Sequence, residues 1–424
     1  MSIAIQADSN LPQGYILVNG TAAATVRQNG TIVVPTLSAT NTAITNITFS
    51  DSTTMNTAPN SFGFKNRIIN GDMRIDQRNA GLSAVRVNTT GGTVAESYTI
   101  DRWQMYAYRW PNVFGTNNGV LSARQVPVND LPGFSKALSI NVATAANPIS
   151  ATDAFHIVQS IEGQNITDLA YGTSQAKTTT LSFWVKCSIT GTFAGFVRVL
   201  NNTSPGVWPY IFTYTVNNTN TWEYKTITVP GNTVQKPNND NIAGIQILFD
   251  FGSGVNFQTS SINQWLTTNT NTITNATGTT PLIATAGANI QFTGVQLETG
   301  PTATPFELRP IGAELALCQR YYFKNTADRP YTIFGAGVGV AGNQANFYSA
   351  LPVPMRSIPT ITQSTLRLYS GTIGFNVTGV DETLGSKNVA SVGIQVASGL
   401  TAGQMYYLQA LNSTSAYIDY SAEL

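Results

Sequence analysis

Few residues of this 424-residue chain could carry nucleophilic or metal chemistry, because it holds one histidine and two cysteines. A catalytic triad needs a histidine with a nucleophile and an orienting acid, and the sequence around His156 has no such signature. We expect His156 to be structural, and Cys187 and Cys318 to be small buried apolar side chains. The counts exclude a zinc ribbon and a site built from several histidines. These residues predict that the protein is not an enzyme.

Acidic residues offer two further chemistries. Two facing carboxylates can hydrolyse a glycan, but the scattered acids do not single out a pair, and the repeat typical of a β-helix depolymerase is absent from the sequence. Asp72, Asp101 and Glu298 fall at the edges of the first, second and last expected strands of a large domain. Such oxygens could hold a structural calcium ion, with ordinary surface carboxylates as the alternative. No other cofactor is expected.

Aromatic side chains are more informative, since sugar rings stack on exposed aromatic faces beside hydroxyl and amide donors. Trp103 and Trp110 lie in DRWQMYAYRWP, and Trp208 and Tyr210 lie in PGVWPYIF. We expect Trp103 in a core. Trp110 and Trp208 stand beside prolines and turns, where a ligand-binding role and a core role are equally compatible with the sequence, and Tyr210 is a candidate beside Trp208.

The composition indicates β structure. Charged residues make up 10% of the chain, against about 25% in typical soluble domains, and Thr, Asn, Ser and Gly take their place. The net charge of +1 argues against a general electrostatic attraction to nucleic acid or anionic lipid. No apolar run approaches the roughly 18 residues of a membrane helix, and the first residues do not form a signal peptide.

Residues 1–61 are poor in large apolar side chains. The run YILVNGTAAATVRQNGTIVV contains Asn19-Gly20 and Asn29-Gly30, and Asn-Gly is a strong hairpin signal, so we expect three short strands in a meander. The following residues offer too little for a core of their own. We expect this part to pack against another chain, with an extended linker as the alternative.

Residues 62–309 predict one large antiparallel β-sandwich of the jelly-roll kind. Apolar and polar residues alternate over 180–189, 192–200, 222–230 and 242–251, and turn-rich stretches separate these runs. Residues 310–324 predict one connecting helix, because apolar side chains recur there every three or four residues. Residues 325–424 return to strands and glycine turns, so we expect an all-β protein with a second, C-terminal sandwich.

Three long stretches resemble a domain of bacteriophage tail-fibre and receptor-binding proteins. They are NRIINGDMRIDQRNAG with YTIDRWQMY, then IEGQNITDLAYGTSQAKTTTLSFWVKCSITGTFAGFVR with WEYKTITVPG, and GVQLETGPTATPFELRPIGAELALCQRYY. The end of the chain, VASGLTAGQMYYLQALNSTSAYIDYSAEL, is similar to the C-terminal domain of such fibres. The resemblance covers about residues 62–424. It implies a sandwich like those of carbohydrate-binding modules.

The resemblance also implies a function. It suggests a virion fibre that assembles in the host cytoplasm, forms a homotrimer, joins other tail or baseplate proteins through residues 1–61, and binds host surface polysaccharide. No nucleic-acid partner and no membrane insertion are expected. A fibre-borne glycan depolymerase and a fibre on the capsid are the alternatives.

We expect the receptor site in residues 325–424, the end away from the attached N-terminus. This segment places aromatic side chains among Asn, Ser and Gly, a mixture suited to stacking and hydrogen bonding. Tyr348 and Tyr369 are the candidate ligand-binding residues, and the other aromatic side chains of the group are Tyr331, Phe347, Tyr406 and Tyr407.

Overall fold

The computed structural model describes residues 65–424 apart from 82–84, 89–94, 110–118, 202–206, 267–272 and 383–384, together with six strands nearer the N-terminus. The chain divides into two compact units, Met1–Gly63 and Phe64–Leu424. In the first unit an antiparallel sheet has the order β1(Ile3–Ala7), β2(Gln13–Val18), β3(Thr21–Arg27), β4(Ile32–Val33), and β5(Ile47–Thr48) pairs with β6(Thr54–Met55). The hairpin predicted at Asn19-Gly20 is confirmed, since β2 and β3 pair antiparallel on either side of it.

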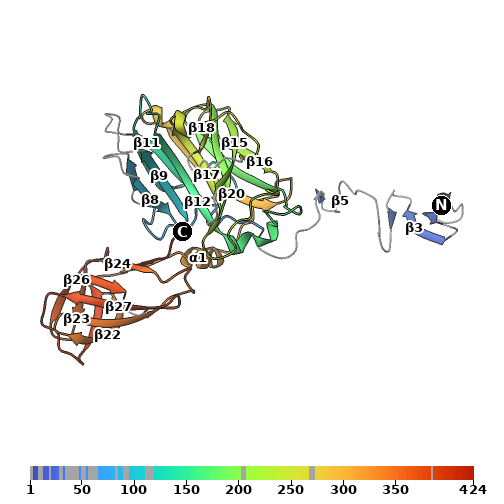
Figure 1. The fold of residues 1–424 in the computed structure, drawn as a ribbon. Helices are drawn as coiled ribbons and strands as arrows, with labels where there is room; N and C mark the ends of the chain where they lie inside the picture. Colours follow the sequence, from blue (N-terminus) through green and yellow to red (C-terminus); the bar gives the residue numbers. More distant parts are fainter. Residues whose placement is uncertain are drawn as a thin grey trace. The chain divides into compact units, whose positions relative to one another are not determined.

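The second unit begins with two six-stranded antiparallel sheets (Figure 1). The first sheet has the order β16(Glu223–Val229), β13(Thr179–Cys187), β20(Asn289–Thr299), β11(Lys136–Thr144), β10(Val120–Pro127), β7(Val85–Asn88). The second has the order β15(Val207–Val216), β14(Gly191–Leu200), β17(Ala243–Ser253), β12(Asp153–Glu162), β9(Trp103–Arg109), β8(Ala95–Ile100). Four of these strands, β13, β14, β16 and β17, lie within one or two residues of the runs that the alternation predicts.

Aromatic side chains join the two sheets into a sandwich. On β13 the alternating residues Leu181, Phe183, Val185 and Cys187 are all buried, as the sequence predicted. The ring of Phe183 meets that of Phe249, on β17 of the other sheet, edge to face at a centroid distance of 4.9 Å. Burying a phenylalanine side chain stabilises the fold by about 1.5–3 kcal/mol, so these contacts account for the tight pairing of the layers.

A loop covers part of the outer face of the second sheet. It carries the short helical turn η3(Val255–Phe257) and the two-residue strands β18(Gln258–Thr259) and β19(Asn275–Ala276), which pair in parallel. Its apolar residues Ile262, Leu266 and Ile273 pack on a buried cluster that includes Phe196 and Leu248. The outer face of this sheet is therefore partly apolar and covered. Two further helical turns of the sandwich are η2(Gly163–Leu169) and η4(Leu282–Ala284).

After α1(Ile311–Gln319), the one α-helix among the described residues, the strands form a small sheet and a closed barrel. The sheet has the order β21(Tyr322–Thr326), β29(Tyr417–Ser421), β24(Thr360–Ser364). The barrel has the order β22(Ile333–Ala341), β23(Gln344–Ala350), β27(Val389–Val396), β26(Gly374–Glu382), β25(Leu366–Tyr369), β28(Met405–Ala410). The predicted all-β class is confirmed, but the C-terminal strands close into a barrel, which removes the open edges of the sandwich expected there.

The predicted helix ends earlier than its pattern of apolar residues suggests. The pattern continues through Tyr321 and Tyr322, but Tyr322 begins β21 and pairs with Ser421 of the last strand. Tertiary pairing with a distant strand here outweighs the local helical preference. The last strand, β29, is paired on both sides, with β21 and β24.

Buried ionic contacts join the small sheet to the sandwich. Glu162, fully buried on β12, receives hydrogen bonds at 2.7 and 2.8 Å from Arg320 and at 2.6 Å from the hydroxyl of Tyr321. Burial opposes ionisation of Glu162, but the hydrogen bonds and positive charge of these partners outweigh it and lower its pKa. Arg102, which is 1% exposed, pairs with Glu423 beside the C-terminus. These contacts connect the two parts by charge as well as by chain.

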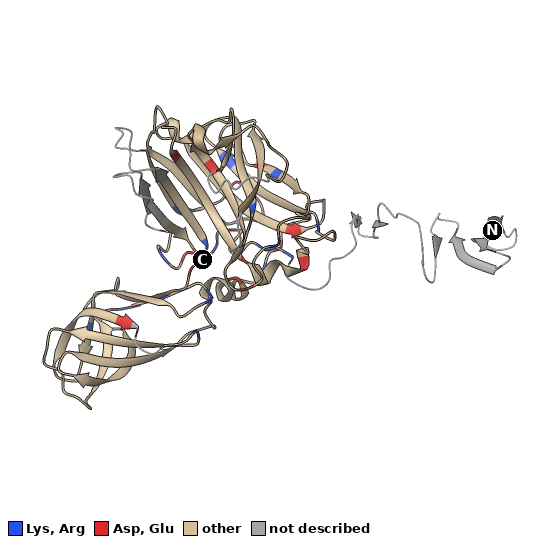
Figure 2. Ribbon diagram, in the orientation of Figure 1, with Lys and Arg blue, Asp and Glu red and all other residues tan. Residues whose placement is uncertain are grey.

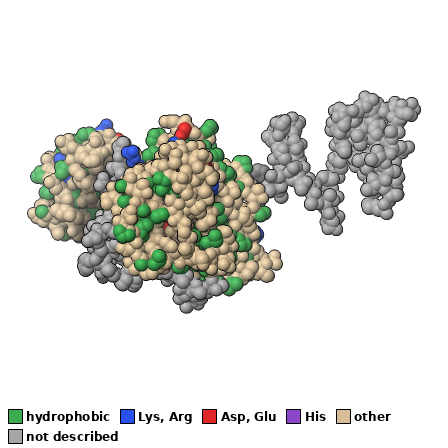
Figure 3. Space-filling view, turned by 90° about the horizontal axis from the view of Figure 1, so that it is seen from above, with side chains coloured by type: hydrophobic (Ala, Val, Ile, Leu, Met, Phe, Trp, Pro, Cys, Tyr) green, Lys and Arg blue, Asp and Glu red, His purple; other side chains and the backbone are tan. Residues whose placement is uncertain are grey.

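No helix in the part of the chain that the structure describes has the length and apolar character to span a membrane. Charged side chains are thinly spread over the strands, as the composition indicates (Figure 2). The visible face in Figure 3 consists largely of uncharged polar and backbone atoms with scattered apolar side chains.

Candidate functional site

The sandwich residues proposed to stack on a sugar face inward. Trp208 and Tyr210 are 9% and 4% exposed, and the ring of Tyr210 lies 5.6 Å from that of Trp265, edge to face. Trp103 is fully buried, as expected. Trp110 lies outside the described residues. Trp208 and Tyr210 thus do not present a free ring face to a ligand, because both side chains are buried on β15.

The three carboxylates proposed to hold calcium already accept hydrogen bonds from protein groups. Asp72 pairs with a neighbouring arginine, and Asp101 accepts from the backbone and side-chain nitrogens of Gln77 at 2.7 and 2.5 Å. Glu298 accepts from the backbone nitrogen and hydroxyl of Thr304 at 2.8 and 2.5 Å. Among the described residues no group of three or more His, Cys, Asp or Glu could hold a metal ion. The structure does not bring the three together as a metal site.

Both cysteines are buried and unbonded to each other, in agreement with their predicted role as small apolar side chains. Burial raises the pKa of the Cys187 thiol and raises that of Cys318 well above its ordinary value. Both thiols stay protonated at neutral pH, so neither is activated as a nucleophile. His156 lies on β12, and its Nδ1 atom is buried without a hydrogen-bond partner.

The barrel exposes a group of large apolar and aromatic side chains on neighbouring strands. Tyr348 of β23 is 70% exposed, and Val338 of β22 and Met405 and Tyr407 of β28 are also exposed. Strand β22 pairs with both β23 and β28, so these side chains share one surface. By contrast, Phe347 and Tyr406 alternate with them and are buried. Exposed apolar groups that gather in this way mark interaction surfaces.

Arg367 of β25 continues this surface. Its guanidinium carbon lies 4.6 Å from the ring centre of Tyr331 and 4.9 Å from that of Tyr369. Its Nε and Nη2 atoms donate to the Oε1 atom of Gln409 at 2.8 and 2.6 Å, and Tyr369 pairs with Tyr407 across the strands. We call the surface formed by Tyr331, Val338, Tyr348, Arg367, Tyr369, Met405 and Tyr407 the barrel face, and the buried Gln409 holds Arg367 in it.

The barrel face combines what a sugar-binding surface requires. Rings stack on the apolar faces of sugars, and a guanidinium fixed by aromatic rings and an amide is a directed donor. No described residue accepts a hydrogen bond from Nη1 of Arg367, so this atom remains a donor for a ligand. The structure brings the predicted Tyr369 into this group and places the predicted Tyr348 on the strand beyond β22. Arg367 was missed, although an arginine between leucines in a strand is a signal of an outward side chain.

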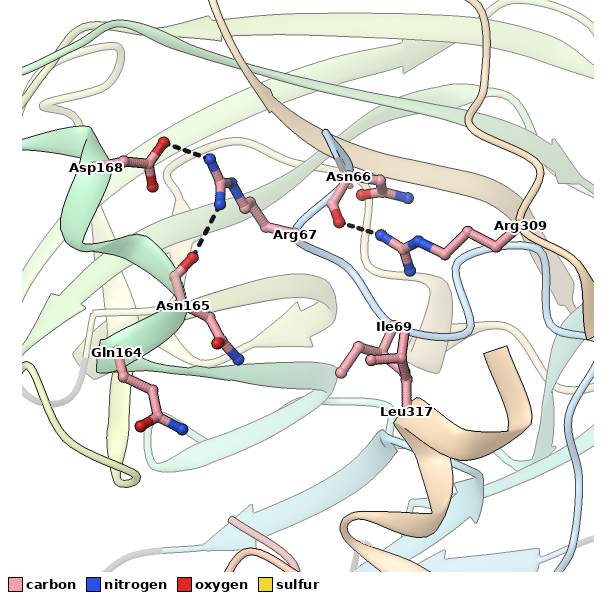
Figure 4. Close-up of a pocket in the computed structure, with 8 residues that line it drawn as sticks. All are labelled: Asn66, Arg67, Ile69, Gln164, Asn165, Asp168, Arg309 and Leu317. Carbon is pink, nitrogen blue, oxygen red and sulfur yellow. Dashed lines mark hydrogen bonds and ion pairs between the residues drawn. The ribbon is translucent and has the colours of Figure 1, made fainter. Parts of the chain in front are cut away.

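A cavity of about 370 Å³ lies beside α1, where Ile69 and Leu317 meet the polar side chains of Asn66, Arg67, Gln164, Asn165, Asp168 and Arg309 (Figure 4). Arg67 donates to Asp168 at 2.5 Å and to the Asn165 carbonyl oxygen at 3.1 Å. Arg309 is held by backbone carbonyls and by Glu314 at 3.2 Å. The charges around this cavity are thus satisfied within the protein, and the cavity presents no aromatic ring.

No family model matches the chain, and comparison with curated proteins gave no match. Solved structures that it resembles are carbohydrate-binding modules and a phage tailspike domain. The enzymatically active domain of tailspike protein 4 from bacteriophage CBA120 is 16% identical, with 56% of this chain and 22% of that one covered and a TM-score of 0.26. The xylanase 10B modules of Clostridium thermocellum are 12% identical, with 49% and 28% covered and a TM-score of 0.25.

A third likeness is to the family 11 carbohydrate-binding module of Clostridium thermocellum, solved with a mixed-linked tetrasaccharide. It is 10% identical, with 53% of this chain and all of that one covered and a TM-score of 0.25. This chain spans less than a third of the length of the tailspike and xylanase structures. Likenesses this remote do not decide what the chain binds.

Proposed function

We propose that the protein is a structural fibre protein of a phage virion that binds host cell-surface glycan and does not cleave it. The observation that carries the glycan-binding part is the barrel face, where Tyr331 and Tyr369 flank Arg367 beside the exposed ring of Tyr407. Aromatic planes and fixed polar donors on one surface are the chemistry that recognises sugar rings.

The fibre part of the proposal is supported by the resemblance of residues 62–424 to phage receptor-binding proteins and by the separation of Met1–Gly63 as a unit of its own. In this proposal the N-terminal unit attaches the fibre to tail or baseplate proteins, and the barrel contacts the host. Three chains assemble into the fibre in the host cytoplasm, and no metal is needed for binding.

The barrel face can be tested by single substitutions in the full-length protein. Tyr407→Ala and Tyr369→Ala each remove a ring, and we expect glycan affinity to fall about tenfold, since a central aromatic contact contributes more than about 1 kcal/mol. Tyr224→Ala is the matched control, because Tyr224 is 43% exposed on β16 of the sandwich, close to the 40% of Tyr407. Binding would be measured on an array of bacterial surface polysaccharides and by adsorption to host cells.

Equal binding by the wild type and both barrel variants would remove the barrel face from the proposal. A loss in Tyr224→Ala as large as in Tyr407→Ala would do the same. Substitutions are preferable to cutting the chain near Asn325, because a shortened chain would also lose β29, which pairs with β21, and Glu423, which pairs with Arg102 of the sandwich. A binding loss in the shortened chain would therefore not isolate the barrel.

Two assays address the alternatives. Release of reducing sugar from bound polysaccharide by the purified protein would show a depolymerase and overturn the non-enzymatic assignment. Immunogold labelling of virions should place the protein on the tail, with the N-terminal unit nearest the particle. Label on the head would indicate a capsid fibre.

A further inference from the structure

The outer face of the second sheet carries an arginine that has no carboxylate partner among the described residues. Arg198 lies on β14 between Val197 and Val199, which are both buried in the core, so its side chain is on the outer face. Its Nε atom donates to the Oε1 atom of Gln246 at 2.7 Å, and its guanidinium carbon lies 4.7 Å from the ring centre of Phe196. No described carboxylate pairs with it, and its Nη atoms donate to no described residue.

This arrangement is unusual because a charge removed from water is normally paired. Arg198 is half-buried, and burial lowers its pKa to about 10. At neutral pH the side chain still carries its positive charge. The buried arginines do have carboxylate partners: Arg102 pairs with Glu423, and Arg309 pairs with Glu314. Arg198 differs from these two arginines, and it shares the lack of a described carboxylate partner with the half-buried Arg356 and Arg367.

The residues around Arg198 supply hydrogen-bonding groups without negative charge. Gln246 donates to the hydroxyl of Ser160 at 2.8 Å on the neighbouring strand β12. Farther along β12, His156 stacks on Tyr106 with ring centres 5.1 Å apart. Burial and then the positive charge of Arg198 lower the pKa of His156 to about 3, so the imidazole is neutral. A neutral imidazole carries no charge that would repel Arg198 or attract an anion.

The carboxyl group of Asp250 lies on the same face but is held elsewhere. His156 pairs with Asp250 across the strands, yet the Asp250 carboxyl accepts hydrogen bonds from the hydroxyls of Ser253 and Thr274. Burial raises the pKa of Asp250 to about 7, and hydrogen bonds from Ser253, Gly252 and Thr274 oppose that shift only in part. The positive charge of Arg198 is thus left for a ligand.

We propose that Arg198, with Gln246, Ser160, His156 and Tyr106 around it, binds the carboxylate of an acidic sugar unit. A guanidinium fork matches a carboxylate through two parallel hydrogen bonds, and the amide of Gln246, itself bonded to Ser160, holds the Arg198 side chain in place for them. This inference rests on the proposed glycan-binding function and adds a second contact, on the sandwich, with a preference for negatively charged glycan.

The test is calorimetric titration of the full-length protein with sodium glucuronate, glucose and inorganic phosphate. We expect glucuronate to bind at least tenfold more tightly than glucose or phosphate. Arg198→Gln should reduce glucuronate affinity to that of glucose. Arg198→Lys keeps the charge but loses the fork, so it should retain only part of the preference for glucuronate. If Arg198→Gln does not fold, Arg198→Lys still tests the proposal, since wild-type affinity in this variant would contradict it.

Arg124→Gln is the matched control, because Arg124 is an exposed arginine on β10 of the other sheet and its loss changes the net charge equally. It should leave glucuronate affinity unchanged, and so should Tyr407→Ala on the barrel face. The inference is overturned if glucuronate binds no better than glucose, if phosphate binds as well, if Arg198→Gln or Arg198→Lys binds like the wild type, or if Arg124→Gln loses as much. Failure of the barrel proposal would show separately, in the adsorption of Tyr407→Ala to cells.

Discussion

Glu423 connects the end of the chain to the interior of the sandwich, and its charge can be removed with little change of shape. Its carboxylate pairs with Arg102 and, at 2.7 Å, with Arg78. The Arg102 side chain is 1% exposed and also lies 3.6 Å over the ring of Tyr321. In Glu423→Gln the amide oxygen can still accept a hydrogen bond, but the buried guanidinium loses its counter-charge.

The expected cost follows from that burial. Breaking a buried ion pair by removing one partner costs about 3–5 kcal/mol, and the retained hydrogen bond places Glu423→Gln near the lower limit, about 3 kcal/mol. Unfolding entropy of about 2.1 cal/mol/K per residue over a unit of roughly 360 residues converts this into a fall in melting temperature of about 4 °C. The free energy of unfolding should fall by the same amount in denaturant titrations.

Calorimetry and guanidinium unfolding would measure the effect. Asp130→Asn is the control, because its ion pair with Lys186 is exposed, and such pairs contribute at most about 1 kcal/mol. The double variant Arg102→Met with Glu423→Gln should recover most of the loss, since the fully buried guanidinium is removed together with its counter-charge and Arg78, the other partner of Glu423, is 17% exposed. If Glu423→Gln is as stable as Asp130→Asn, or if the double variant is less stable than the single one, the reasoning about the buried charge is refuted.

Two further predictions concern pH and assembly. Burial raises the pKa of Asp250 to about 7 in the folded state, from about 3.9 in the unfolded state. Between about pH 4 and 7 only the unfolded state loses this proton, so the free energy of unfolding falls as pH rises, by at most roughly 4 kcal/mol. Asp250→Asn should gain stability relative to the wild type over that range, and a constant difference in urea unfolding at pH 4 and 7 would contradict this. Light scattering of the full-length protein should give about three times 45.3 kDa, and a monomeric mass at micromolar concentration would count against the trimer.

Local patterns in the sequence predicted much of the fold. The alternation on β13 and β17 identifies strands because side chains on a strand point to opposite faces in turn, which is a property of a few adjacent residues. Asn19-Gly20 predicts a hairpin for the same kind of reason, since both residues tolerate the backbone angles of a tight turn. The low charge and abundant turn residues likewise indicated the all-β class before any contact was known.

Tertiary structure decided the features that depend on distant partners. Barrel closure depends on pairing between strands far apart in the sequence, and the early end of α1 depends on Tyr322 finding Ser421. The burial of the Trp208 side chain and the lack of a described carboxylate beside Arg198 depend on which strands lie next to β14 and β15. Burial and charge pairing are sums over neighbours in space, and a linear pattern does not contain those neighbours. The sequence by itself therefore determined the class and the strands, and the fold alone decided which side chains remain available to a ligand.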